Sequence, residues 1–458
     1  MSDVTSVLPT GSAPDPTLAR AEGVGLISMH SPYSQTACCL LFLSAGSWLD
    51  PPGRCGLAHV YEHAFFAGAT GVPTAAQVAD AAAGLGCRHN AHTYREYMYF
   101  YLSGPATTGR AAIDLLLDCY DQPEPTAAEL DKQRKAIFSE LALFAEQRER
   151  RLRDLAAQAL YAPDGLGRPP LGIAEDISSI GAADLRWFAR QAASGSRITL
   201  ITDGPDEPDG LAFGAELAEL LRGGLGQPPI STDAVSAGKG AAGQVVTEPT
   251  PNYGPLANVL LSADTDAVLV ALIIPGPCYL LSSRETYALR MFHTIVGGSA
   301  SARLQRRLRD QLGLAYQART TLEMHATTGA LLVVLSCRPG DFADAVKVAA
   351  AVVIDALTAP IEPGELARAR EINRGTHVHD RETAVGRCLV AGLELMRRQQ
   401  VGHDAELFDL WGEIDATEIA AVAGRVLRPD LARAAVIGPP RIADQVGLAP
   451  LPDSWRLL

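Results

Sequence analysis

Two histidines and a glutamate lie close together in the segment GLAHVYEHAFFAGAT, where His59, Glu62 and His63 form the pattern H-x-x-E-H. Residues four apart lie on one face of a helix, so both imidazoles can reach one metal ion while Glu62 lies beside them. Two histidines with a carboxylate suit a catalytic zinc ion, which keeps a fourth position for water. The alternative is a helix on which both histidines merely pack against a core. The pattern predicts a zinc site in which Glu62, itself not a ligand, takes a proton from the attacking water.

A third ligand is expected on the predicted helix ELDKQRKAIFSELALF, which carries Glu140 at a distance of 77 residues from His63. On its own, a glutamate on a helix is most often a solvated residue. The order H-x-x-E-H is that of the inverzincin peptidases, the reverse of the commoner H-E-x-x-H. With the downstream helix, the chain resembles the pitrilysin/insulinase family, in particular its short two-domain members related to mitochondrial processing peptidases. The resemblance extends over nearly the whole chain and implies that Glu140 is the third ligand of one Zn²⁺ per chain.

The segment GLGCRHNAHTYREYMYFYLSG resembles the edge strand of that family, and the positions that bind substrate are occupied by Asn90, Ala91, His92 and Thr93. An edge strand can pair with an extended peptide through main-chain hydrogen bonds, which tolerate many side chains. His89 and His92 are interpreted as strand or loop residues near the site, because three metal ligands are already assigned.

A second signature lies in the segment GGSASARLQRRLRDQLGLAYQA, in which Arg309 and Tyr316 are seven residues apart. The resemblance implies that these side chains hydrogen-bond the substrate backbone or the oxyanion that forms beside the metal. The alternative is a basic helix end followed by a turn at Gly313 and a strand in which Tyr316 packs.

Two positions depart from the pattern of the family. Many active relatives carry a glutamate seven residues before the ligand glutamate, where this chain has Gln133. Glutamine can hydrogen-bond but cannot take up a proton, so Gln133 predicts an activity that is weaker or differently arranged. Tyr61 replaces the usual leucine before Glu62, a change expected to alter packing or the pocket and not metal coordination.

These residues predict a zinc-dependent endopeptidase that hydrolyses peptides or peptide precursors. Long relatives place the Arg and Tyr pair across a chamber from the zinc, and a chain of two domains cannot close such a chamber alone. We therefore expect a homodimer in which each subunit's Arg309 and Tyr316 face the zinc of the other, with a heterodimer as the alternative. Two other functions stay open. One is a non-catalytic or weakly active subunit that binds peptides or supports a partner peptidase, for which Gln133 argues; the other is a metal hydrolase with a different substrate.

The predicted elements repeat along the chain. A stretch rich in Gly, Pro, Ser and Thr predicts a linker at 223–255 between a zinc-bearing domain at 20–222 and a second domain at 256–445, with tails at 1–19 and 446–458. Leu-Ser pairs at 102 and 335, and Glu-Leu pairs at 129 and 365, are separated by 233 and 236 residues. A tandem duplication explains these similar offsets. We predict an α+β fold of two tandem homologous domains, each a mostly antiparallel sheet covered by helices, as in mitochondrial processing peptidase.

Apolar patterns predict strands and helices in the same order in both halves. The first half is expected to have strands at 36–44, 97–103 and 197–205, and the second at 267–274, 330–336 and 433–440. Helices are expected at 110–119 and 343–356, and a charged helix begins near Glu129 and again near Glu365.

The net charge and the lengths of the apolar runs argue against some classes of binding partner. The 458 residues carry a formal net charge of -13, which disfavours nucleic-acid binding because phosphates require clustered Lys and Arg. No apolar run reaches the roughly 18 residues that a transmembrane helix needs, and the first residues lack the basic and apolar regions of an export signal. The eight cysteines form no C-x-x-C pair and are expected to be reduced. The expectation is a cytoplasmic protein that binds neither nucleic acid nor membrane.

Overall fold

The computed structural model describes residues 16–21, 24–69, 71–72, 74–120, 125–162, 165–193, 197–205, 258–401 and 404–442. The predicted linker at 223–255 and the C-terminal tail at 446–458 lie outside the described residues, as does most of the N-terminal tail at 1–19. Strand β1 (Thr17–Ala21) begins inside the predicted bounds of that tail, where it pairs with β2 (Val24–His30).

The first half of the described chain contains a six-stranded sheet in the order β1-β2-β6-β3-β5-β4. All neighbours pair antiparallel except β2 and β6, which are parallel. The remaining strands are β3 (Thr36–Leu43), β4 (Arg88–Thr93), β5 (Met98–Pro105) and β6 (Ile198–Gly204). One face of the sheet shares a hydrophobic core with α1 (Leu57–Phe65), α2 (Ala75–Gly84), α3 (Gly109–Tyr120), α4 (Ala127–Ala145), α6 (Ala174–Ser179) and α7 (Ala182–Ala193).

The second half of the described chain repeats this plan with a five-stranded sheet in the order β7-β11-β8-β10-β9. Only β7 and β11 pair in parallel there. The strands are β7 (Val259–Ser262), β8 (Val268–Pro275), β9 (Ala315–Met324), β10 (Gly329–Cys337) and β11 (Arg433–Gly438). A second core joins one face to α9 (Ser283–Val296), α10 (Arg303–Gln305), α11 (Phe342–Thr358), α12 (Pro363–Asp380), α14 (Asp404–Glu413) and α15 (Ala416–Val426).

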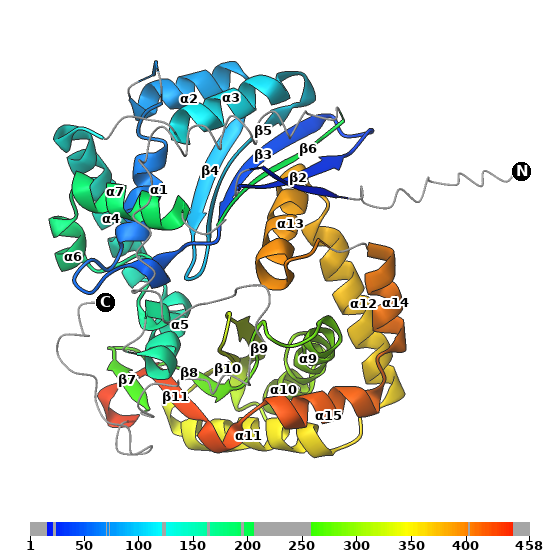
Figure 1. Ribbon diagram of the computed structural model, residues 1–458. Helices are drawn as coiled ribbons and strands as arrows, with labels where there is room; N and C mark the ends of the chain where they lie inside the picture. Colours follow the sequence, from blue (N-terminus) through cyan, green and yellow to red (C-terminus); the bar gives the residue numbers. More distant parts are fainter. Residues whose placement is uncertain are drawn as a thin grey trace, which may run out of the picture.

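The other face of each sheet is covered by a helix from the opposite half (Figure 1). Helix α5 (Arg148–Tyr161) follows α4 in the chain but packs on β8 and β11 of the second sheet. Helix α13 (Ala384–Arg398) follows α12 but packs on β3 and β6 of the first sheet. Because both faces of the central strands are covered, β8 is buried along its whole length, as its unbroken apolar sequence requires.

The exchange of helices ties the halves together through buried polar contacts as well as apolar ones. Asp203, at the end of β6, is fully buried and binds Arg387 of α13 at 2.7 Å. The hydroxyl of Ser31 donates a second hydrogen bond to Asp203 at 2.7 Å. At another point of contact, Glu96 accepts a hydrogen bond from the main chain of Ala326 and lies 2.9 Å from Nδ1 of His325. The two halves are therefore interlocked.

The predicted α+β fold with two similar sheets covered by helices is confirmed. The six strands and two helices predicted from apolar patterns match the observed elements to within two residues at each end. The exchange of α5 and α13 was not predicted, since the division at 223–255 assigned every helix to its own half. None of the described helices is long and apolar enough to cross a membrane. All eight cysteines are free thiols, as expected.

Candidate metal centre

Helix α1 is held at its start by the buried carboxylate of Asp50, which accepts hydrogen bonds from the main chain of Gly56 at 2.7 Å and Ala58 at 2.9 Å. Such contacts satisfy N–H groups that a helix start leaves unpaired. Burial raises the pKa of Asp50 to about 7, and the main-chain hydrogen bonds oppose this rise. Gly56 has a φ of 101°, and a Cβ there would lie 2.9 Å from Cα of Gly172, so glycine is required. These contacts fix the turn that carries His59.

Helix α4 brings Glu140 to α1. The hydroxyl of Thr126 caps its first turn by accepting a hydrogen bond from the main chain of Glu129 at 3.2 Å. Leu130 and Ile137, seven residues apart, are buried in the first core and define the inner face of the helix. Glu140 lies three residues beyond Ile137 and therefore points to the same side, where α4 packs against α1.

The structure brings the three predicted ligands together. Oε2 of Glu140 lies 3.3 Å from Nε2 of His59 and 3.4 Å from Nε2 of His63. Donor atoms of the three residues all lie within 4.8 Å of one another. Two tetrahedral ligands, each about 2.0–2.1 Å from a zinc ion, are expected to lie about 3.3 Å apart. The donor set and its spacing therefore fit a zinc-sized ion.

The surroundings of the two histidines also suit metal binding. His59 is buried, and its Nδ1 lies 3.3 Å from the carbonyl oxygen of Leu171. A proton held at Nδ1 by this carbonyl leaves Nε2 as the lone-pair donor, an arrangement typical of metal-binding histidines. When no metal ion is bound, hydrogen bonding with the His59 and His63 rings holds the pKa of Glu140 well below its usual range. A metal ion would take the place of the shared proton between these Nε2 atoms and the carboxylate.

Glu62 lies on α1 between the two histidines and is partly exposed. It is not among the three residues whose donor atoms converge. This placement leaves its carboxylate available for a role other than coordination, and its role as a base stays a prediction.

The predicted substrate strand is at the edge of the first sheet. β4 comes last in the strand order and pairs with β5 alone among the described strands. Ala91 points inward and is buried, whereas Asn90 and His92 are exposed and Thr93 is partly exposed. The ring of His89 packs edge-on against Phe66, 4.9 Å away, and not against the metal ligands. The main chain of β4 is therefore placed for pairing with a peptide, although its role in binding stays a prediction.

Arg309 and Tyr316 lie in the other half of the molecule from α1 (Figure 1), on the segment that includes α10 and β9. Arg309 belongs to a π-helical segment, Arg306–Gln311, and its guanidinium lies 5.7 Å from the ring of Tyr316. The predicted turn at Gly313 has a φ of 62°. Tyr316 is 79% exposed, which argues against the alternative in which it packs in a core. Within one chain, the pair is not part of the metal cluster.

The two departures from the family pattern have local explanations. Gln133 donates a hydrogen bond from Nε2 to Glu129 at 3.1 Å, one turn back on α4. The ring of Tyr61 packs near Phe188 and Phe100, at centroid distances of 5.1 and 6.3 Å. Tyr61 is therefore a packing residue, as expected, and Gln133 is engaged within its own helix.

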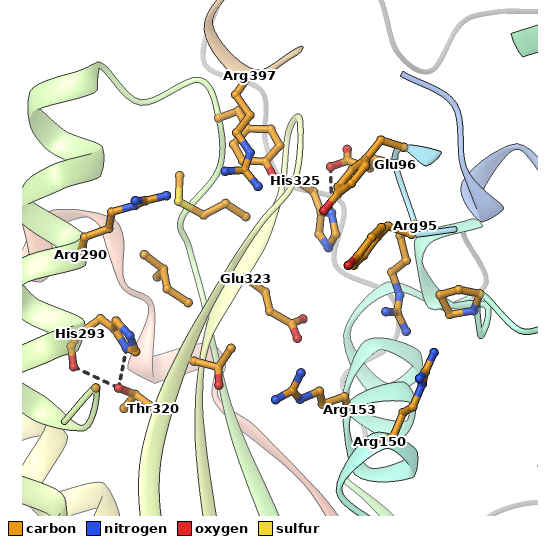
Figure 2. Close-up of a pocket in the computed structure, with 18 of the residues that line it drawn as sticks. Arg95, Glu96, Arg150, Arg153, Arg290, His293, Thr320, Glu323, His325 and Arg397 are labelled. Carbon is orange, nitrogen blue, oxygen red and sulfur yellow. Dashed lines mark hydrogen bonds and ion pairs between the residues drawn. The ribbon is translucent and has the colours of Figure 1, made fainter. Parts of the chain in front are cut away.

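Sequence analysis missed a large cavity between the halves, with a volume of about 1400 Å³ (Figure 2). Its walls include the end of β4, at His92 and Thr93, and residues of α5, α9, β9 and the end of α13. Arginines are prominent among the side chains that face it. No short motif could reveal this site, because its walls come from segments far apart in the sequence.

The fold and the site together define a class of protein: two α+β domains, the first of which carries a His-His-Glu cluster that fits a metal ion. A family model described as Insulinase (Peptidase family M16) matches residues 26–172, and one described as Peptidase M16 inactive domain matches residues 179–373. The chain belongs to the M16, or insulinase, peptidase family. This confirms the resemblance and agrees with the position of the His-His-Glu cluster, which lies in the first half of the described chain.

Relatives and solved structures cover almost the whole chain. An uncharacterized zinc protease of Mycobacterium tuberculosis is 26% identical over 442 residues, covering 94% of this chain and 96% of the relative. One from Mycobacterium leprae is 25% identical over 420 residues, covering 91% and 90%. A peptidase M16 inactive-domain structure from Pseudomonas fluorescens superposes with a TM-score of 0.79 at 18% identity, covering 96% of this chain and 100% of that one. A protease from Helicobacter pylori gives 0.74 at 15%, covering 93% and 100%. The last two likenesses concern the fold alone.

Proposed function

We propose that the protein is a zinc-dependent endopeptidase that hydrolyses peptides or peptide precursors, and that it acts in the cytoplasm. The observation that carries this proposal is the convergence of His59, His63 and Glu140, with N···O distances of 3.3 and 3.4 Å that suit tetrahedral zinc. Family membership and relatives named as zinc proteases support the same reaction class.

The side chains of the site have distinct roles in this proposal. Bound zinc supplies a Lewis acid that makes water acidic enough to react near neutral pH. Glu62 takes the proton of the attacking water and passes it to the leaving amine. The exposed edge of β4, at residues Asn90, Ala91, His92 and Thr93, holds the substrate extended by main-chain pairing.

The remaining donors come from a second subunit. Arg309 and Tyr316 donate hydrogen bonds to the oxyanion, and they do so across the interface of a homodimer. Two facts support this arrangement: Tyr316 is 79% exposed, and the pair lies in the half of the chain that lacks the metal ligands. A heterodimer with a related subunit would supply the same groups.

The experiment combines a metal assay with peptide digestion. Purified protein is incubated with a varied peptide mixture, with and without a chelator, and the products are identified by mass spectrometry. We expect about one zinc per chain and cleavage that stops with chelator and in Glu62→Gln. Chelator-resistant cleavage, or full activity of Glu62→Gln, would remove zinc and Glu62 from the mechanism. Sedimentation tests the dimer, because a fully active monomer excludes it.

A non-catalytic peptide-binding subunit is the second candidate, and the environment of Gln133 favours it. This side chain is occupied by Glu129 and has no proton to exchange with the site. A protein of this kind would bind peptides without cleaving them, whether or not zinc is present. Digestion by the unmodified, zinc-loaded protein distinguishes the two functions, because only an enzyme cleaves the peptides. Cleavage that appears only in Gln133→Glu would assign the missing activity to Gln133.

A further inference from the structure

Three arginines gather on one wall of the cavity between the halves. Arg290 projects from α9, and Arg397 and Arg398 end α13, which crosses over from the second half to the first sheet. Figure 2 shows Arg290 and Arg397 reaching into the cavity from these two elements. The sequence separates Arg290 from Arg397 by 107 residues, so only the fold brings the charges together.

The contacts of these arginines are with aromatic rings and not with carboxylates. Arg398 donates a hydrogen bond to the hydroxyl of Tyr287 at 2.7 Å, and the guanidiniums of Arg398 and Arg290 lie 4.7 and 5.8 Å from the centre of its ring. Arg397 lies 5.0 Å from the ring of Tyr279. Within the described part of the chain, none of the three forms an ion pair.

The cluster carries excess positive charge. Arg290 is exposed to the cavity, but the surrounding protein atoms still lower its pKa, as do the charges of Arg397 and Arg398. Tyr287 and Asp380 act in the opposite direction. Nε of Arg397 is buried and has no hydrogen-bond acceptor. Three like charges that form no ion pair with a carboxylate are unfavourable in a partly enclosed space. An anion bound in the cavity would relieve that repulsion.

Most carboxylates that line the cavity are already engaged, and Glu149 pairs with Arg319. Asp154 is engaged by Arg95 at 2.7 Å, and Glu96 is held by His325 and by the main chain of Ala326. Glu146 and Glu323 also line the cavity without an ion pair among the described residues, but neither is among the groups that most affect the pKa of Arg290. The whole chain carries a net charge of -13, so general attraction of anions is not expected. The cluster is therefore a local feature, suited to recognising an anionic group at short range.

The position of the cluster indicates what that group is. The same cavity is lined by His92 and Thr93, the last residues of edge strand β4. A peptide that pairs with β4 would run past these residues into the cavity. Arginine binds carboxylates well, because its planar guanidinium matches the two carboxylate oxygens.

We propose that Arg290, Arg397 and Arg398 form a subsite for carboxylates of the peptide substrate and favour peptides with Asp or Glu beyond the segment paired to β4. The inference rests on the proposed function in taking a peptide as the substrate. The carboxylate belongs to an acidic side chain or to the C-terminus of the peptide.

Peptide binding to the chelator-treated, full-length protein tests the subsite without turnover. Fluorescence anisotropy compares three labelled peptides of one sequence: one containing Glu, one with Gln in its place, and the Gln peptide with an amidated C-terminus. We expect the Glu peptide to bind about tenfold more tightly than the Gln peptide if side chains are recognised. A similar loss on amidation instead assigns the subsite to the C-terminus.

Variants then connect the preference to the arginines. Arg290→Gln and Arg397→Gln should each remove most of the preference for a carboxylate, and Arg397→Lys should retain part of it. Arg338→Gln changes the net charge equally at an exposed residue outside the cavity, and should retain it fully. Raising the salt concentration from about 0.05 to about 0.5 M should weaken binding of the carboxylate peptide more than that of its neutral counterpart, which tests the subsite in the unmodified protein as well.

Equal binding of all three peptides, or a preference that survives in both glutamine variants, would overturn the subsite. Parallel digestion with the zinc-loaded protein separates the two proposals. Selective binding without cleavage keeps the subsite and rejects the peptidase, whereas cleavage without any preference for carboxylates keeps the peptidase and rejects the subsite.

Discussion

Helices α1 and α4 in the first half, and α9 and α12 in the second, pack against each other at corresponding places in two similar domains. The side chains at the two contacts are very different. Between α1 and α4, two imidazoles meet the Glu140 carboxylate. Between α9 and α12, Asn373 donates a neutral hydrogen bond to the hydroxyl of Thr294 at 3.0 Å. The scaffold is shared, and the capacity for metal chemistry depends on a few side chains.

The contact between α1 and α4 is also more exposed to solvent than the contact between α9 and α12. The side chains of His63 and Glu140 are 21% and 34% exposed, so an ion and a water molecule can reach them. Thr294 is 5% exposed, and Met291 and Ile295 beside it on α9 belong to the apolar core. The second contact has become a packing contact, in keeping with the match of this half to a domain described as inactive.

The largest expected effect comes from removing the carboxylate at the first contact. Glu140→Leu leaves two imidazoles, which are too few ligands for tight zinc binding. We expect bound zinc to fall from about one per chain to nearly none, and peptidase activity to fall by at least about a thousandfold. Metal analysis by mass spectrometry and a peptide cleavage assay measure both effects. Asn373→Leu, the matched change at the second contact, should retain zinc and activity, and the comparison fails if the two variants behave alike.

The next largest effect is a loss of stability when the ion pair that anchors α13 on the first sheet is broken. Arg387→Met leaves the fully buried carboxylate of Asp203 without its cation, which should lower the free energy of unfolding by about 3–5 kcal/mol. Urea denaturation measures this loss. Arg338→Met is the control, because it breaks an exposed pair with Asp341 worth less than about 1 kcal/mol. Similar losses in the two variants would show that α13 is not anchored through Asp203.

The parts of the site that depend on local spacing could be predicted from the sequence. Helical geometry alone places His59 and His63 on one face, whereas the edge strand around Asn90 was predicted from the family resemblance. Glu140 needed the family resemblance, because nothing in the spacing indicates which of many helix glutamates folds back onto α1. The cap by Asp50 was missed, since its carboxylate reaches N–H groups six and eight residues away, outside the usual capping spacing.

Sequence patterns could not predict which helices pack against which sheet. Both α5 and α13 read as amphipathic helices, and amphipathicity says that a face is buried but not against which sheet. Their exchange builds the walls of the cavity and collects Arg290, Arg397 and Arg398 there. Prediction therefore succeeded for single elements and failed where packing decides which elements meet.

A smaller expected effect is a pH dependence of folding stability that comes from His293 in the second half. His293 of α9 lies 2.7 Å from the hydroxyl of Thr320, and burial, followed by the charge of Arg290, lowers its pKa to about 4. The unfolded chain binds this proton near pH 6.5, so folding stability is lost as the pH falls from about 6.5 to 4 and no cost remains above that range.

The variant His293→Gln tests this linkage. Its free energy of unfolding should fall less between pH 7 and 4.5 than that of the unmodified chain, by about 1–3 kcal/mol. Urea denaturation at both pH values provides the measurement, and His30→Gln serves as a control at an exposed histidine. An unchanged pH dependence in His293→Gln would show that the proton is taken up elsewhere.

The smallest expected effect is a loss of stability at the contact between α9 and α12. Asn373→Leu removes the hydrogen bond to Thr294, but the Thr294 hydroxyl still donates to the carbonyl of Arg290 at 2.9 Å, so no buried donor is left unpaired. The loss of unfolding free energy should therefore be only about 0.5–1.5 kcal/mol, measured by urea denaturation. A loss several times larger would mean that this contact is needed to hold α9 and α12 in one arrangement. The two contacts would then both stabilise the fold, and they would differ only in the ability to bind a metal ion.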